Sequence, residues 1–168
     1  MAMEKSDWLL STVEEPIDPL EEIVDPHHHL WDFPAGTYLL PELHMDTGSG
    51  HNVVQTVFVE CGAEYRNDGP EHLRSVGEIE FVRQQSELSV DADGAEIAGI
   101  VGFADLTRGN SVEEVLAAQD AEGGGKFRGI RHANAWDGSD QIRESHTKPP
   151  PGLLNHGNFR EGFAKLGD

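Results

Sequence analysis

Strand-like and helix-like segments alternate four times along the chain, and this alternation constrains the fold more than any other feature. Four apolar, β-rich runs predict strands, at about residues 23–29, 53–61, 97–103 and 127–131. The second run is almost continuously apolar, which is typical of a strand buried on both faces of a parallel sheet. The four runs therefore predict a buried parallel sheet.

Helical patterns separate these runs. Residues 70–86 carry apolar side chains at a spacing of three, which predicts an amphipathic helix with its charged residues on the opposite side. Residues 111–114 match a capping box that opens a short helix to about residue 121, and Asn158 is expected to cap a last helix. Long loops rich in Gly and Pro are expected at 31–50, with one helical turn near 41–45, and at 132–157.

Strand–helix alternation of this kind predicts an α/β fold with a parallel sheet and right-handed crossovers. We expect a barrel-type arrangement truncated to about four βα units of a TIM barrel, which has eight such units and about 250 residues, because the chain has 168. Residues 1–20 are acidic and contain prolines, so they are expected to form a flexible arm before a domain at 21–168.

Charge and composition narrow the classes of function. The chain has 12 Lys and Arg against 31 Asp and Glu, a formal net charge of −19, which argues against binding to nucleic acids or anionic membranes. Its single cysteine cannot form an internal disulfide, and no apolar run approaches the length of a membrane span. These features predict a cytoplasmic protein.

A run of three histidines ends the first predicted strand. Side chains alternate along an extended segment, so His27 and His29 should point to one face and His28 to the other. Two neutral imidazoles on one face can share a divalent metal ion, although catalytic zinc sites commonly have three protein ligands and a water. The alternative interpretation is a solvated loop of histidines.

Polar residues also end two later strands. Glu60 would be costly to bury unless it were paired or bound to a metal or substrate, and the alternative is a carboxylate that faces water. Arg131 and His132 end the fourth strand, where a guanidinium could hold a carboxylate or oxyanion or could pair with a neighbouring acid. The other histidines lack a spacing partner and are predicted to lie on the surface, among them His44, His51, His72, His146 and His156.

The stretch Asp-Pro-His-His-His-Leu-Trp-Asp, at 25–32, resembles the first barrel strand of the amidohydrolase superfamily. The closest branch is the amidohydrolase-related group, which includes fuconolactonase-like and pyrone-dicarboxylate-hydrolase-like lactonases. Residues 57–61, 127–132 and 158–166 resemble later motifs of the same branch. The resemblance implies that residues 21–168 correspond to the N-terminal half of such a barrel.

The resemblance also implies a chemistry. His27 and His29 match the first metal ligands of the group, with zinc as the expected ion, and Glu60, Arg131 and His132 match positions near the substrate. The implied reaction is hydrolysis of a lactone, ester or amide by an activated water. In the group, further ligands and a carboxylate base come from later strands, and some members work without a metal, so no catalytic residue is assigned within this chain.

Three functional hypotheses follow from the sequence. The chain is a hydrolase fragment that is inactive alone, or it assembles with a second copy or a separate C-terminal half into a working barrel. The third hypothesis is a non-catalytic acidic protein that binds metal or a partner. Metal binding without hydrolysis of any lactone would favour the third.

Overall fold

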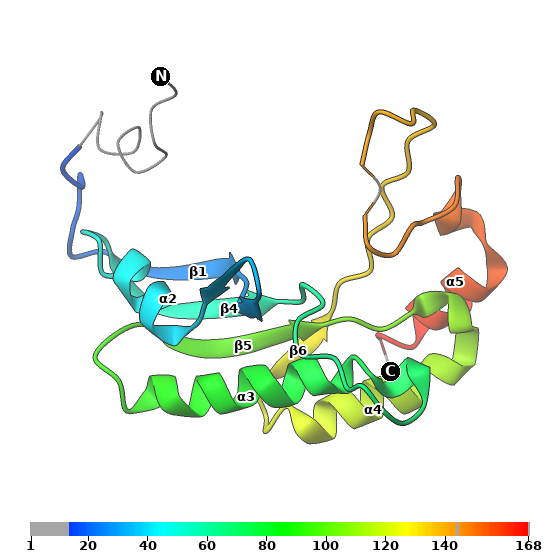
Figure 1. The fold of residues 1–168 in the computed structure, drawn as a ribbon, viewed down its shortest axis with the longest axis horizontal. Coiled ribbons are helices and arrows are strands. Elements are labelled where there is room, and N and C mark those ends of the chain that lie inside the picture. Colours follow the sequence, from blue (N-terminus) through cyan, green and yellow to red (C-terminus); the bar gives the residue numbers. More distant parts are fainter. Residues whose placement is uncertain (1–13, 144, 168) are drawn as a thin grey trace.

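A four-stranded parallel sheet forms the centre of the computed structural model, which describes residues 14–143 and 145–167 (Figure 1). The strands are β1 (Glu22–His28), β4 (Asn52–Val59), β5 (Glu96–Gly102) and β6 (Phe127–Ile130), in the spatial order β1-β4-β5-β6. All three pairings are parallel. The predicted α/β fold with a parallel sheet is confirmed, since each predicted strand overlaps an observed one.

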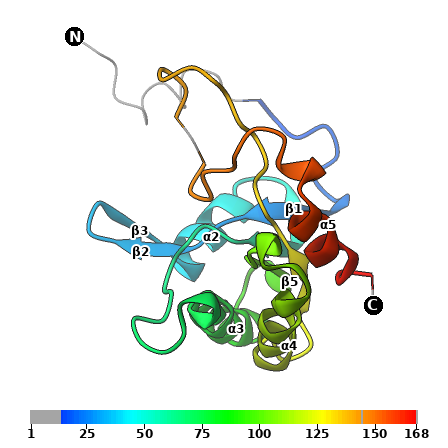
Figure 2. The same cartoon turned by 90° about the vertical axis from the view of Figure 1, so that its right-hand side faces the viewer.

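Three helices cover one face of this sheet (Figures 1 and 2). They are α2 (Leu40–Thr47), α3 (Val76–Val90) and α4 (Glu113–Glu122). A fourth helix, α5 (Gly157–Ala164), follows the long loop after β6 and packs on the 3-10 segment η2 (Leu106–Val112). Short 3-10 turns, η1 (Glu71–Leu73) and η3 (Leu153–Asn155), precede α3 and α5.

Apolar burial between the sheet and α3 holds these layers together. Ile79 and Val82 of α3 are fully buried in one cluster with Phe58, Ile97 and Ile100 of the central strands. Each such side chain stabilises the fold by roughly 1.5–3 kcal/mol relative to an exposed one. The spacing of three that predicted this helix therefore marks its buried side.

The opposite face of the sheet carries no helix among the described residues (Figure 2). A Cβ on Gly99 would lie 3.4 Å from the side chains of Val57 and Arg128, so both lie over this face. Val57 is only partly buried and Arg128 is exposed. The sheet thus has one packed face and one open face.

The loop predicted at 31–50 has more structure than expected. Strands β2 (Trp31–Phe33) and β3 (Gly36–Tyr38) form an antiparallel hairpin, in which Trp31 stacks on Tyr38 with ring centroids 5.1 Å apart. The predicted helical turn is the eight-residue helix α2. Strands of three residues are too short to give a period-two pattern, which is why the sequence did not predict them.

Helix starts also differ from the predictions. Helix α3 begins at Val76 rather than residue 70, after the turn η1. The predicted capping box is wrong: α4 begins at Glu113, and the Ser111 hydroxyl donates to the Arg108 carbonyl. Asp105 caps the preceding segment by accepting from the Thr107 amide, and η2 runs directly into α4, so no free helix end remains at Ser111. Helix α5 has no side-chain cap, so the cap predicted from Asn158 is also wrong.

Most of the predicted arm at 1–20 lies outside the described residues, and its described part, 14–20, forms neither helix nor strand. Within the described part of the chain, no helix combines the length and apolar character needed to span a bilayer.

Candidate functional site

The carboxyl ends of the four parallel strands lie along one edge of the sheet (Figure 1). His29, Glu60 and Arg131 follow β1, β4 and β6 at this edge. A parallel sheet places such residues together because every strand points the same way. We refer to this edge, with the side chains that follow its strands, as the strand mouth.

The two outer histidines of the run converge at the strand mouth. His27 Nε2 lies 3.3 Å from His29 Nε2, with the rings nearly perpendicular at an interplanar angle of 86°. His29 Nδ1 donates to the Val59 carbonyl at 2.7 Å, because a carbonyl can only accept. The lone pair of His29 therefore lies on Nε2 and points toward His27.

His28 lies on the other side of the strand, as the alternation predicted. It is buried, its Nε2 is 3.1 Å from the Thr56 hydroxyl, and its ring meets Phe58 edge-on. Burial lowers the pKa of His28 to about 4, against the weaker raising effects of a backbone hydrogen bond and of Asp25. His28 is thus a neutral core residue, distinct from exposed His27 and partly buried His29.

Glu60 is fully buried at the strand mouth and is paired rather than facing water. Its Oε1 accepts a hydrogen bond from Arg131 Nε at 2.8 Å, and Arg131 also donates to the Glu60 carbonyl. The other oxygen, Oε2, lies 3.3 Å from His146 Nε2 but has no hydrogen bond of good geometry. Glu60 is therefore the acid that pairs with Arg131, a partner that the sequence left open.

His146 is exposed, as the sequence predicted, but it has contacts that the sequence did not reveal. It comes from the long loop after β6, and its ring contacts Phe103 at the end of β5, with centroids 5.5 Å apart. Its contact with Glu60 spans 86 residues of sequence, so no local spacing could reveal it. His72 likewise pairs with Glu114, at 3.0 Å.

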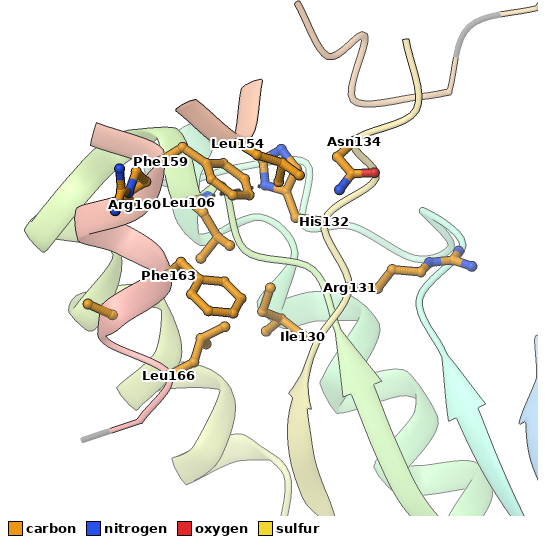
Figure 3. A pocket seen from close by; sticks show the side chains of 11 residues that line it. Leu106, Ile130, Arg131, His132, Asn134, Leu154, Phe159, Arg160, Phe163 and Leu166 are labelled. Carbon is orange, nitrogen blue, oxygen red and sulfur yellow. Dashed lines mark hydrogen bonds between the residues drawn. The ribbon is translucent and has the colours of Figure 1, made fainter. Parts of the chain in front are cut away.

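His132 lies apart from Arg131 although the two are adjacent in sequence. Figure 3 shows Arg131 pointing away from His132, which lies beside Leu154 and Phe159. The Leu106 amide donates to His132 Nδ1 at 3.2 Å, and the His132 ring packs against those of Phe103 and Phe159. The structure therefore brings Glu60 and Arg131 together and leaves His132 on the neighbouring cluster.

Glu78, on α3, is a buried acid beside the strand mouth that the sequence interpretation missed. Its Oε1 accepts from the amides of Cys61 at 3.0 Å and Ala63 at 2.8 Å, which fixes the turn after Glu60. Its Oε2 is buried without a partner, and burial raises the pKa of Glu78 to about 7. Glu78 precedes Ile79 and lies four residues before Val82 on the buried side of α3, a spacing that could have revealed it.

A groove opens beside the free edge of β6, next to the strand mouth (Figure 3). Its volume is about 680 Å³, and it lies between the end of β6 and α5. Ile130, Phe163 and Leu166 form its apolar floor, while Asn134 and Arg160 are polar groups of its lining. Phe163 is 60 % exposed, so an apolar ligand or chain could cover it.

Among the described residues, no group of three or more His, Cys, Asp or Glu is arranged to hold a metal ion. The imidazole pair therefore supplies two ligands at most within this part of the chain. Compared with family models, with curated proteins and with solved structures, the chain gives no significant match to any of them.

Proposed function

We propose that the protein is a metal-dependent hydrolase of the amidohydrolase-related type, acting on a lactone, ester or amide. The observation that carries the proposal is the convergence of His27 Nε2 and His29 Nε2 at 3.3 Å. The motifs quoted from the sequence, which resemble that group, support the choice of reaction. The barrel-type fold, of which this sheet would form four βα units, is part of the same proposal.

The distance between the two nitrogens fits a shared ion. Zinc–nitrogen bonds of about 2.0–2.1 Å at a tetrahedral angle separate two ligand nitrogens by roughly 3.3–3.4 Å. The hydrogen bond from His29 Nδ1 to the Val59 carbonyl supports this role, because it leaves Nε2 free to bind and fixes the ring. We therefore assign His27 and His29 as the residues that would hold the metal.

When bound, a divalent ion of this kind lowers the pKa of water and polarises a carbonyl oxygen. The chain's own contribution would be to orient the substrate. Arg131 uses its Nε and one Nη2 proton on Glu60, which leaves other N–H groups for a carboxylate or carbonyl of the substrate. Glu60 would act by holding Arg131, because its carboxylate is already buried and paired.

Calorimetry with zinc tests the metal part of the proposal. We expect weak binding by the wild-type chain, because two imidazoles form an incomplete set, and loss of that binding in a His27→Ala/His29→Ala variant. A His51→Ala/His156→Ala variant is the matched control, since both residues are exposed and lie outside the pair. Equal zinc binding by all three proteins would contradict the assignment.

A panel of lactones and esters tests the reaction. Zinc-dependent hydrolysis that disappears with His27 and His29 supports a hydrolase. Zinc binding at the pair without hydrolysis of any substrate would favour the second candidate, a non-catalytic metal-binding protein. The same imidazole pair carries that candidate, so the two differ only in the turnover assay.

A further inference from the structure

Charge is distributed unevenly between the two lateral edges of the sheet, which are formed by β1 and β6. Residues 14–65, which include β1 and β4, contain eleven Asp and Glu and no Lys or Arg. Residues 126–165, which begin at β6, contain seven of the twelve basic residues of the chain. The seven are Lys126, Arg128, Arg131, Arg143, Lys148, Arg160 and Lys165. On the edge strands themselves, β1 carries Glu22 and Asp25 and β6 carries Arg128, so one lateral edge of the sheet is acidic and the other is basic.

Both edges are open among the described residues. Strand β1 pairs only with β4 in this sheet, and β6 pairs only with β5. An unpaired edge presents backbone donors and acceptors that can bind another strand. Because the sheet is wholly parallel, β1 of one molecule can add to β6 of another with all strands still pointing the same way.

Exposed apolar side chains lie near both lateral edges, at the carboxyl ends of the strands. The groove of Figure 3 lies at the carboxyl end of β6, with Phe163 and Leu166 exposed. The hairpin segment that follows β1 carries the exposed side chain of Phe33. In a parallel pairing of β1 with β6, that segment would lie at the carboxyl end of β6, where the groove is.

We propose that the open edges of β1 and β6 bind a second copy of the same chain, with β1 of each copy paired to β6 of the other. A two-fold arrangement satisfies both edges of both sheets at once, and eight parallel strands are the number that closes a barrel. The open face carrying Val57 would then become the interior. The dimer rests on the barrel-type fold of the proposed function but not on its hydrolase chemistry, so loss of turnover and loss of dimerisation are separate outcomes.

Charge complementarity favours a second copy as the occupant. Each molecule carries both an acidic and a basic edge, so two copies match each other twice, whereas the formal charge of −19 disfavours contacts that bring acidic surfaces together. The pairing would also place the β6 end of the second copy beside His27 and His29. The imidazole pair, incomplete in one molecule, would then lie inside a shared site.

Sedimentation velocity on the full chain tests the proposal through a pair of charge reversals. Glu22 is exposed at the start of β1, and Arg128 is exposed near the start of β6. We expect a dimer for the wild type, and dimerisation weakened about tenfold or more in Glu22→Lys or Arg128→Glu alone, since each homodimer contains the like-charged contact twice.

Mixing the two single variants should restore dimerisation. In the mixed dimer one contact joins Lys to Glu and the other keeps the native Arg and Glu, so neither is repulsive. Asp93→Lys and Arg74→Glu are matched controls on exposed positions away from both edges, and they should dimerise as the wild type does. A wild-type monomer at every concentration, or a mixture that stays monomeric, would overturn the proposal; so would unaltered dimers of both single variants.

Discussion

Replacing Glu78 by glutamine should change how the stability of the protein depends on pH. The carboxyl is fully exposed to water in the unfolded chain, with a pKa of about 4.5, and burial raises it to about 7 in the fold. Between these values the folded protein holds a proton that the unfolded chain has released. Stability from this group is therefore complete below about pH 4.5 and is lost as pH rises through 7.

The size of the effect follows from the two pKa values. A shift from 4.5 to about 7 corresponds to roughly 3 kcal/mol, at about 1.4 kcal/mol for each pKa unit. Glu78→Gln keeps an oxygen that accepts from the Cys61 and Ala63 amides but cannot ionise. It also leaves a buried amide N–H₂ where Oε2 has no partner, at a cost of about 1–3 kcal/mol that does not vary with pH.

Urea denaturation at several pH values between 5 and 8 measures this difference. The free energy of unfolding of the wild type should fall relative to that of Glu78→Gln by up to about 3 kcal/mol across the range. Glu80→Gln is the control, because Glu80 is partly exposed and pairs with Arg66 at 3.5 Å. Parallel pH profiles for the wild type and Glu78→Gln would refute the assignment of a neutral buried acid.

Two further substitutions test the strand mouth and the core beside it. The wild type should lose about 3 kcal/mol of stability as pH falls from 6.5 to 4, because the unfolded histidine takes up a proton that buried His28 does not. His28→Gln should not show this loss, and urea denaturation at pH 4 and 7 measures the difference. Arg131→Met should cost about 3 kcal/mol at pH 7, because it removes the hydrogen-bonding cation from buried Glu60, and a second change of Glu60 to Gln should recover part of that loss in the same assay.

The sequence predicted the sheet well because its signals are local. The apolar runs at 53–61 and 97–103 mark strands buried in the centre of the sheet, and their polar successors lie at one edge as a parallel sheet requires. The alternation in the histidine run likewise placed His28 in the core and the other two together. Each of these predictions depends only on the period of an extended chain.

The sequence did not determine the contacts that join distant parts of the chain. The pairing of Glu60 with Arg131 and His146 joins residues more than 70 positions apart. The alternation of an extended chain accounts for the opposite directions of Arg131 and His132, but the contact of His132 with Phe159 of α5 depends on tertiary packing. Sequence patterns located the strand mouth, whereas the partners of each charged group there depend on tertiary packing.

Two adjacent residues at the end of β4 connect the imidazole pair of the strand mouth with Arg131. Val59 accepts the hydrogen bond that orients His29, and the next residue, Glu60, holds Arg131 in place. Any shift of β4 along its axis would therefore move the imidazole pair and the guanidinium together. Glu78, bound to the amides of Cys61 and Ala63, fixes the turn that follows, so its ionisation near neutral pH acts on the same short segment. The buried acid that lowers stability as pH rises is thus also the group that fixes the turn directly after Val59 and Glu60.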